Sequence, residues 1–508
     1  MKRHKIIFFT ILSLGILYFF INGAGGFFLP SIPEKIALIP LDSRPCNTQY
    51  PELVGKILGA EVAYPEQGLD ELTKPSDKEL LWSWLAEQNE ADIIIINIQQ
   101  LFNGGLISSR DPLSYANWQK DFQRLKEFCE TNKEKKIVLI SIIPRLIPTQ
   151  FTELAPYQRA IKTYEEELSI INLSRRNLKP SLPSDLPAEI YESYKEIFTQ
   201  SELIALQLST LINDRLVEEL IIGQDDGAPY GPGNRVISNL KQIMKNEKIH
   251  FLPGADELST LALVKNALPS SKIGIQLYYG NESKKDVVHP YENISLAEQL
   301  ALKTDYLGLE ITAEAPYRFL IHNDSENFEH LKNELYITGF DYTAIIDVAF
   351  TNRGDLSFLN LFLKESILPS AYGGWNTAGN SIGSELAYFA AWHHAENSSL
   401  REPQRSEALL AAAKYRYLRI ADDLIYQGVL RDKLNQEVLS LKQNPTDLDD
   451  KLLAEEILAK LYESSQEDLS RLSAIITADL GLSPEKTILE TKIVLPWPRT
   501  FEAKIIFP

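Results

Sequence analysis

The run Asp92-Ile-Ile-Ile-Ile-Asn-Ile98 is almost uninterrupted in its apolar side chains and shows no alternation of apolar and polar residues. Such a run predicts a strand that is buried on both faces, as in a parallel sheet flanked by helices. Comparable runs recur along the chain and alternate with stretches of helical spacing. We therefore expect an α/β fold with strands at residues 36–41, 61–64, 92–98, 136–142, 219–223, 249–252, 273–278, 317–322, 344–349 and 369–372.

This number of strands is compatible with two architectures. A (β/α)8-barrel-like parallel sheet with extra strands is the preferred prediction, and two doubly wound α/β domains are the alternative. In either case we expect residues 34–385 to form the α/β domain, with the acidic segment 150–217 as a helical insertion. Residues 386–485 have helical spacing throughout, and residues 486–508 predict a terminal β-hairpin.

Length and charge limit the class of partner. The 508 residues contain 51 Lys and Arg against 69 Asp and Glu, for a formal net charge of −18. Such a chain repels phosphate backbones, and no basic stripe with interleaved aromatic residues offsets this charge, so nucleic acid is not an expected partner. With 44% hydrophobic residues, the composition is that of a globular protein. No HExxH motif and no Cys/His cluster with zinc spacing is present.

The N-terminus predicts export. The basic segment Met1-Lys-Arg-His-Lys5 precedes an almost wholly apolar run from Ile6 to Ile21. This order is typical of a signal peptide or a signal anchor, and the sequence leaves its cleavage open. We expect residues 1–33 to be this segment plus a short tether. The basic flank predicts that the rest of the chain lies outside the cytoplasm, anchored to the membrane or secreted.

The most informative strand end lies in Glu219-Leu-Ile-Ile-Gly-Gln-Asp-Asp-Gly-Ala-Pro-Tyr-Gly231, where an apolar strand ends on Asp225 and Asp226. Ligands of α/β proteins bind at the carboxyl ends of strands, because the loops there are not required for packing of the core. Two acids at such an edge need partners or a function, although one of them could simply cap the next helix. Other expected strand ends are also polar. The candidate ligand-binding residues there are Asp42, Arg44, Asn103, Arg110, Arg145, Tyr230, Asp256, Glu257, Asn352, Arg353, Trp375, Asn376 and Asn380.

Arginine and tryptophan give these strand ends a specific chemistry. The arginines either neutralise nearby acids as structural ion pairs or form a bidentate clamp for a carboxylate or phosphate. Trp375 lies in Gly373-Gly-Trp-Asn-Thr-Ala-Gly-Asn380, between glycines that allow a ligand to approach. Its ring either stacks on a sugar, with Asn376 and Asn380 binding hydroxyl groups, or packs into the core.

Several motifs at these strand ends are long and specific: Pro40-Leu-Asp-Ser-Arg-Pro-Cys-Asn47, Gly104-Gly-Leu-Ile-Ser-Ser-Arg110, Asp225-Asp-Gly-Ala-Pro-Tyr-Gly231, Gly254-Ala-Asp-Glu257 and Gly373-Gly-Trp-Asn-Thr-Ala-Gly-Asn380. Together with the closing Leu495-Pro-Trp-Pro-Arg-Thr-Phe-Glu502, they make nearly the whole chain resemble a bacterial family catalogued as a domain of unknown function, DUF4127. This resemblance implies no activity and assigns no catalytic residue. A looser likeness is to barrel glycosidases that cleave N-acetylhexosaminides, which also place adjacent acids after a mid-barrel strand.

These observations favour an exported hydrolase that cleaves a glycosidic bond. We expect Asp226 to donate the proton and Asp225 to orient the attacking group, with Asp256 and Glu257 as the next candidates. Adjacent like charges raise the pKa of one carboxyl group, which suits an acid that is protonated near neutral pH. The expected substrate is a glycan or another small anionic molecule, and no cofactor is required.

Three alternatives remain open, and the oligomeric state is not predicted. A metal-dependent hydrolase would bind Mg²⁺ or Mn²⁺ through the carboxylates of Asp42, Asp225, Asp226 and Asp256. A non-enzymatic cell-surface protein would bind an anionic glycan without turnover. A structural or assembly protein would use the C-terminal helical region as its working surface.

Overall fold

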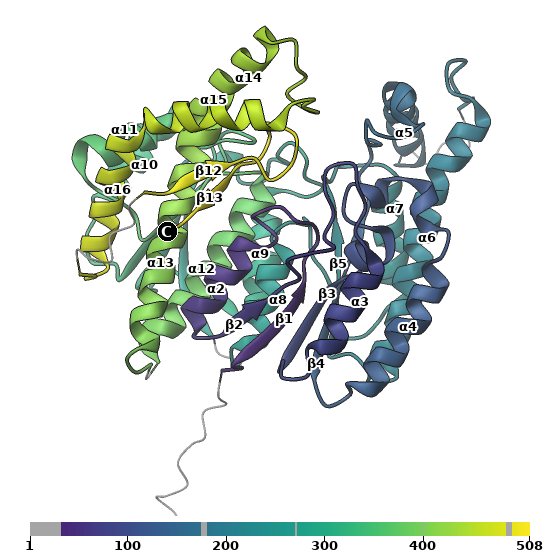
Figure 1. Cartoon of the computed structure of the whole chain (residues 1–508), viewed down its shortest axis with the longest axis horizontal. Coiled ribbons are helices and arrows are strands. Elements are labelled where there is room, and N and C mark those ends of the chain that lie inside the picture. Colours follow the sequence, from purple (N-terminus) through teal and green to yellow (C-terminus); the bar gives the residue numbers. More distant parts are fainter. Residues whose placement is uncertain (1–31, 174–179, 270–271, 399, 484–489) are drawn as a thin grey trace, which may run out of the picture.

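The computed structural model describes residues 32–173, 180–269, 272–398, 400–483 and 490–508. These residues form two parallel sheets with helices packed around them, which confirms the predicted α/β class (Figure 1). The apolar run of the predicted N-terminal signal segment lies outside the described residues. Within the described ranges, no helix has both the length and the apolar character needed to cross a bilayer.

The first sheet has six strands in the order β2-β1-β3-β4-β5-β6. Its strands are β1 (Lys35–Ile39), β2 (Glu61–Ala63), β3 (Ile93–Asn97), β4 (Lys136–Ile143), β5 (Glu219–Gln224) and β6 (Ile249–Phe251). All neighbouring strands are parallel. Every residue of β3 is buried, as its unbroken apolar run predicts. Because β2 and β3 lie on opposite sides of β1, the chain changes its direction of winding at β1, and such switch points are where doubly wound sheets bind ligands.

The second sheet repeats this pattern. Its five parallel strands have the order β11-β10-β9-β7-β8. They are β7 (Ile273–Tyr279), β8 (Leu309–Ile311), β9 (Tyr317–His322), β10 (Tyr342–Asp347) and β11 (Ala371–Gly373). The first strand of this sheet, β7, lies between β8 on one side and β9 on the other, as β1 lies between β2 and β3 in the first sheet. The strands β10 and β11 follow beyond β9.

The preferred prediction of a (β/α)8 barrel was therefore wrong, and the alternative of two doubly wound sheets describes the structure. Both sheets are open, since the first ends at β2 and β6 and the second at β8 and β11. The physical reason is that buried parallel strands have the same apolar pattern in a barrel and in an open sheet. What separates the two folds is the side on which each crossover returns to the sheet, and residue spacing does not encode it.

Helices cover both faces of the first sheet. One face packs on α2 (Gln49–Leu58) and α8 (Leu258–Ala267), and Ile93 and Ile95 of β3 point into this core. The other face packs on α3 (Lys78–Glu87), α4 (Trp118–Thr131), α6 (Ala188–Asn213) and α7 (Pro232–Ile243). Ile94 and Ile96 point into that second core. The predicted insertion at residues 150–217 contains α5 (Gln158–Leu173) and α6, and α6 belongs to the layer that packs on the sheet.

The two sheets share one hydrophobic core. Four helices lie between the two sheets: α2, α8, α9 (Leu296–Leu307) and α12 (Ala378–Asn397) (Figure 1). Phe389 of α12 packs at 5.3 Å, ring centre to ring centre, on Phe319 of β9. The opposite face of the second sheet contacts α10 (Phe328–Leu335) and α11 (Leu356–Glu365). This shared core fixes the two sheets against each other.

The C-terminal region packs on the second sheet and returns to the first. It comprises α13 (Gln404–Ile420), a π-helical segment (Ala421–Leu430), α14 (Arg431–Ser440), α15 (Lys451–Glu463), α16 (Gln466–Asp479) and the antiparallel strands β12 (Lys492–Val494) and β13 (Lys504–Ile506). The boundary expected at residue 385 falls inside α12. In the connection between β12 and β13, the indole Nε1 of Trp497 donates to Oγ of Ser43 at 2.7 Å. The end of the chain thus reaches the segment that follows β1.

Candidate functional site

A cavity of about 230 Å³ lies at the carboxyl ends of both sheets. Segments that follow β1, β3, β4, β5 and β6 contribute Arg44, Leu106, Ile107, Arg110, Arg145, Asp225, Asp226 and Asp256. Segments that follow β7, β10 and β11 contribute Tyr291, Asn352 and Asn376, and the C-terminal connection adds Arg499 and Phe501. The predicted convergence of strand ends therefore occurs, but in the space shared by two sheets. We call this space the charged cavity.

One wall of the charged cavity consists of two acid–arginine pairs. Arg110 donates from Nε and Nη2 to Oδ2 of Asp225, at 2.8 and 2.6 Å, and both side chains are buried. Arg145 donates from Nη1 to Oδ2 of Asp226 at 2.9 Å, and these two side chains are about one quarter exposed. Burial raises the pKa of Asp225. The charge of Arg110 lowers this pKa, and the charge of Asp226 raises it further. Burial and the neighbouring Arg145 lower the pKa of Arg110.

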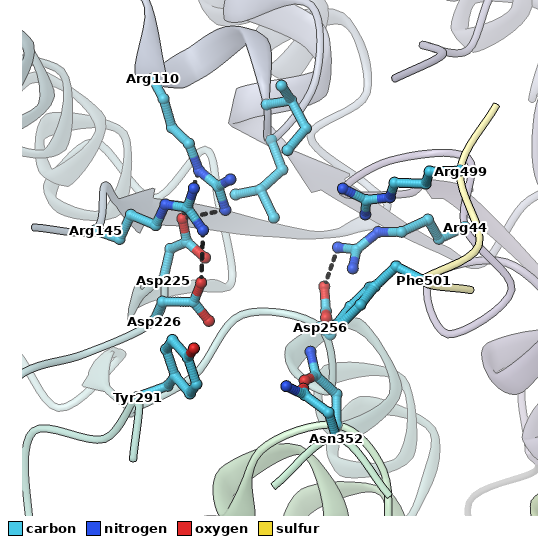
Figure 2. Close-up of a pocket in the computed structure, with 13 residues that line it drawn as sticks. Arg44, Arg110, Arg145, Asp225, Asp226, Asp256, Tyr291, Asn352, Arg499 and Phe501 are labelled. Carbon is cyan, nitrogen blue, oxygen red and sulfur yellow. Dashed lines mark hydrogen bonds and ion pairs between the residues drawn. The ribbon is translucent and has the colours of Figure 1, made fainter. Parts of the chain in front are cut away.

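The opposite wall is built around Arg44 (Figure 2). Its Nε and Nη2 atoms donate to Oδ2 of Asp42 at 2.9 and 2.6 Å, and Nη2 also donates to Oδ1 of Asp256 at 2.5 Å. The Nδ2 atom of Asn47 also donates to both acids, to Oδ1 of Asp42 at 2.9 Å and to Oδ1 of Asp256 at 3.1 Å. Burial lowers the pKa of Arg44, but the charges of Asp256 and Asp42 outweigh it and raise that pKa well above its usual value. Arg44 is thus a permanent cation between two carboxyl groups.

Asp256 is the titrating group of this wall. Burial raises its pKa to about 6, although Arg44 opposes the shift. Its second oxygen, Oδ2, accepts a hydrogen bond from Nδ2 of Asn380 at 3.2 Å. Asp256 faces Asp225 and Asp226 across the cavity (Figure 2). A carboxyl group that titrates near neutral pH and lines a cavity is suited to give and take a proton.

The C-terminal connection closes one side of the cavity. Arg499 donates from Nε to Oε2 of Glu502 at 2.7 Å, and its guanidinium lies 4.8 Å from the ring centre of Trp497 and 5.3 Å from that of Phe501. Glu502 is buried and lies 3.8 Å from Nη1 of Arg44. These contacts hold Arg499 and Phe501 at the cavity wall.

Behind the cavity, the π-helical segment holds the loops that follow β10 and β11. The backbone nitrogen of Gly374 donates to Oδ2 of Asp423 at 2.6 Å, and that of Gly354 donates to the carbonyl oxygen of Asp423 at 3.0 Å. Arg419 pairs with Asp423 at 2.8 Å and donates to the carbonyl oxygen of Trp375 at 3.0 Å. These loops carry the two asparagines of the cavity, so Asp423 positions them.

Some predicted residues have structural roles instead. Glu257 is fully buried in an ion pair of 2.6 Å with Lys303, and Lys303 also donates to the carbonyl oxygen of Gly379 at 2.7 Å. Trp375 is 3% exposed and its ring packs on Phe501 at 5.9 Å, which does not suit a sugar platform. Asp42 holds Arg44 by accepting its hydrogen bonds, and Asn380 holds Asp256 by donating to it.

Three further candidates lie away from the charged cavity. Asn103 lines a neighbouring pocket. Arg353 lies over the ring of Phe350, at 4.8 Å from its centre, and Tyr230 is 36% exposed. Neither Arg353 nor Tyr230 lines the cavity that holds the paired acids and arginines.

The acids proposed as metal ligands are all engaged with arginine. Asp42 and Asp256 share Arg44, Asp225 pairs with Arg110, and Asp226 pairs with Arg145. Among the residues that the structure describes, no group of three or more His, Cys, Asp or Glu side chains is arranged to hold a metal ion. A cation here would have to displace an arginine from its carboxylate.

Comparison with known proteins gives the family of the chain. The family model described as "Protein of unknown function (DUF4127)" matches residues 36–506. The chain belongs to the DUF4127 family. No curated protein and no solved structure matches it.

The DUF4127 site also contains residues that were not predicted as ligands: Tyr291, Arg499, Phe501, Glu502 and Asn47. A signal for several of them was present, because Pro40–Asn47 and Leu495–Glu502 belong to the motifs that carry the family resemblance. Tyr291 has a positive φ of 65° and lies in the segment between β7 and α9, and no pattern in the sequence marks it.

Proposed function

We propose that this DUF4127 protein is a hydrolase that cleaves a glycosidic bond in the charged cavity. The observation that carries the proposal is Asp256, a buried carboxyl group with a pKa of about 6 that faces a second acidic pair. Asp256 is the proton donor to the leaving oxygen. Asp226, held by Arg145, is the carboxylate that stabilises positive charge or directs attack on the sugar.

This assignment differs from the expectation from the sequence, in which Asp226 was the acid, Asp225 the orienting group and Asp256 a next candidate. A general acid needs to be protonated near the working pH, and burial gives Asp256 that property. Asp225 is less accessible than Asp226, because its side chain is buried against Arg110, whereas that of Asp226 is about one quarter exposed beside Arg145. Asp225 and Arg110 form the rigid support of the acidic pair.

The balance of charge supports a sugar as the ligand. Arg44, Arg110, Arg145 and Arg499 are matched by five carboxyl groups in or directly behind the wall: Asp42, Asp225, Asp226, Asp256 and Glu502. Alternating donors and acceptors suit a molecule rich in hydroxyl groups. An anionic substituent would meet Arg145 and Arg499, whose side chains are 25% and 16% exposed, whereas Arg44 is 5% exposed.

The predicted location supports a cell-envelope glycan. A signal segment in residues 1–33 would place the two sheets outside the cytoplasm, anchored to the membrane or free. Cell-wall and capsular glycans are the polymers that an exported bacterial hydrolase would meet.

A second candidate function is glycan binding without turnover. The observation in its favour is that each carboxyl group that lines the cavity already pairs with an arginine. Such a surface binds a sugar by hydrogen bonds even if no proton is transferred.

The test uses the full-length protein and its Asp256→Asn and Asp226→Asn variants. Each is incubated with cell-wall and capsular glycans, with and without EDTA, and released sugars are identified by mass spectrometry. Asp449→Asn is the control, since it removes the same charge from an exposed side chain. We expect release by the parent and the control, unchanged by EDTA, and a loss of about 10²–10⁴-fold in both site variants. Binding without release from any glycan would establish the second candidate, and release by Asp256→Asn at the parental rate would refute the assigned acid.

A further inference from the structure

We propose that a second pocket beside the charged cavity binds a neutral sugar unit, so that the ligand is an oligosaccharide chain. This pocket has a volume of about 470 Å³ and is formed by the segments that follow β2, β3 and β4. We call it the uncharged pocket. The inference rests on the proposed function, because it assigns the neighbouring unit of the same glycan.

The two pockets share a wall. Ile107 lines both of them. It packs in a small cluster with Leu72, Trp497 and Phe151, and Trp497 belongs to the connection that closes the charged cavity. Ile107 therefore separates the two pockets, and a ligand that occupied both would lie across it.

Size supports a common ligand. Sites for small molecules usually have about 300–1,000 Å³. The charged cavity, with about 230 Å³, falls below that range by itself, whereas the two pockets together fall within it. The charged cavity thus fits one unit of a longer ligand.

The lining of the uncharged pocket is chemically different. Its two charged side chains are engaged: Lys78 pairs with Asp121 at 2.8 Å, and Asp111 accepts from the backbone nitrogen of Leu113 at 2.9 Å. Leu113 lines the pocket with a side chain that is 80% exposed, so it offers an accessible apolar surface there. The remaining wall is apolar or carries hydroxyl and amide groups. Such a wall favours a neutral, amphipathic unit over an ion.

Asn103 lines this pocket and has one polar atom without a partner in the described part of the chain. Its side chain is 3% exposed, and its Nδ2 atom donates to Oγ of Ser114 at 3.1 Å. Its Oδ1 atom is buried and has no hydrogen-bond partner within the described part of the chain. A buried acceptor without a partner is costly, and a ligand hydroxyl group would satisfy it.

The pocket is preformed. Gly104 has a positive φ of 90°, and a Cβ atom there would lie 2.5 Å from Cβ of Pro75. The backbone nitrogen of Ser76 donates to the carbonyl oxygen of Gly104 at 2.9 Å, and its Oγ donates to the carbonyl oxygen of Gln100 at 2.8 Å. These contacts lock the segment after β2 to the segment after β3, so little ordering is needed when a ligand binds.

The test measures binding of chitin oligosaccharides, from monomer to hexamer, to the full-length protein by titration calorimetry. Leu113→Ser and Asn103→Ala remove the exposed apolar group and the free acceptor. Leu452→Ser, 73% exposed on α15, is the control for Leu113→Ser. We expect oligomers to bind at least about tenfold more tightly than the monomer. Each pocket variant is expected to reduce oligomer affinity about fivefold and leave monomer affinity unchanged.

Two results would overturn the second subsite. One is an affinity that does not depend on oligomer length, or that falls equally for monomer and oligomers in the pocket variants. The other is the absence of binding by every chitin oligosaccharide, because a neutral sugar unit is the assigned ligand. Neither result decides the proposed hydrolase, which depends on sugar release from the glycan panel and on Asp256. If the panel gives no release but oligomers bind by length, the subsite stands and the hydrolase fails.

Discussion

The Nη2 atom of Arg44 donates to Oδ1 of Asp256 at 2.5 Å, which joins the segment after β1 to the segment after β6. The strands β3, β4 and β5 separate β1 from β6 in the sheet, so this contact forms above the sheet edge. It determines the chemistry of the site, because the charge of Arg44 opposes the burial that raises the pKa of Asp256.

The first prediction is the pH dependence of glycan release. The pKa of Asp256 is raised from 3.8 to about 6, so its protonated fraction falls as pH rises through about 6. We expect the rate to fall over the same interval and Asp256→Asn to abolish this limb of the profile. The contribution of this group to stability has the same sign: it is largest below about pH 4 and is lost by about pH 6, because the unfolded chain releases the proton first. A rate that rises through about pH 6 would contradict the assignment.

The second prediction compares two arginines. Arg44 is buried between Asp42 and Asp256, whereas the side chain of Arg145 is 25% exposed beside Asp226. Arg44→Gln leaves buried charges without a partner and should lower the free energy of unfolding by roughly 3–5 kcal/mol. Arg145→Gln should lower it by about 1 kcal/mol or less. Urea unfolding at neutral pH measures both values, and equal losses would mean that the two ion pairs are equally exposed in solution.

The third prediction concerns divalent ions. The acids suggested as metal ligands are bound by arginine, so we expect neither EDTA nor added Mg²⁺ or Mn²⁺ to change the melting temperature or glycan release. A metal that bound only the folded state would add about 2.7 kcal/mol at roughly a hundredfold excess over Kd. A rise in melting temperature with Mn²⁺ that disappears in Asp226→Asn would instead support the metal-dependent alternative.

The sequence predicted the strands better than their arrangement. The run at Ile93–Asn97 and the similar runs gave the α/β class, because burial on both faces leaves a direct mark on composition. The order β8-β7-β9-β10-β11 in the second sheet repeats that of the first, but it depends on the side of each crossover, which apolar spacing does not record. The side to which each crossover returns distinguishes a barrel from two open sheets, so the sequence pattern could not decide between these folds.

The site was predictable where it consists of strand ends. Asp225, Asp226, Asp256 and Arg44 meet in one cavity because carboxyl ends of parallel strands share an edge. Phe501 could not be placed in the same way, because it arrives from a connection between two short strands at the end of the chain. Trp375 was ambiguous for another reason. A ring beside glycines can face a ligand or fill the core, and only packing decides between them.

The last prediction separates two adjacent acids behind the cavity. Burial, with the charge of Asp423, raises the pKa of Asp422 to about 8, so Asp422 carries a proton at neutral pH. Burial raises the pKa of Asp423 only to about 6, and at neutral pH this group is the charged partner of Arg419. Asp422→Asn replaces one neutral group by another and should leave stability and glycan release nearly unchanged.

Asp423→Asn leaves a buried arginine without its carboxylate and should lower the free energy of unfolding by roughly 3–5 kcal/mol. Because Asp423 also binds Gly374, release should fall in that variant even where it remains folded. Urea unfolding and mass spectrometry measure the two effects, and equal behaviour of the variants would show that Asp423 does not hold the loops of the cavity.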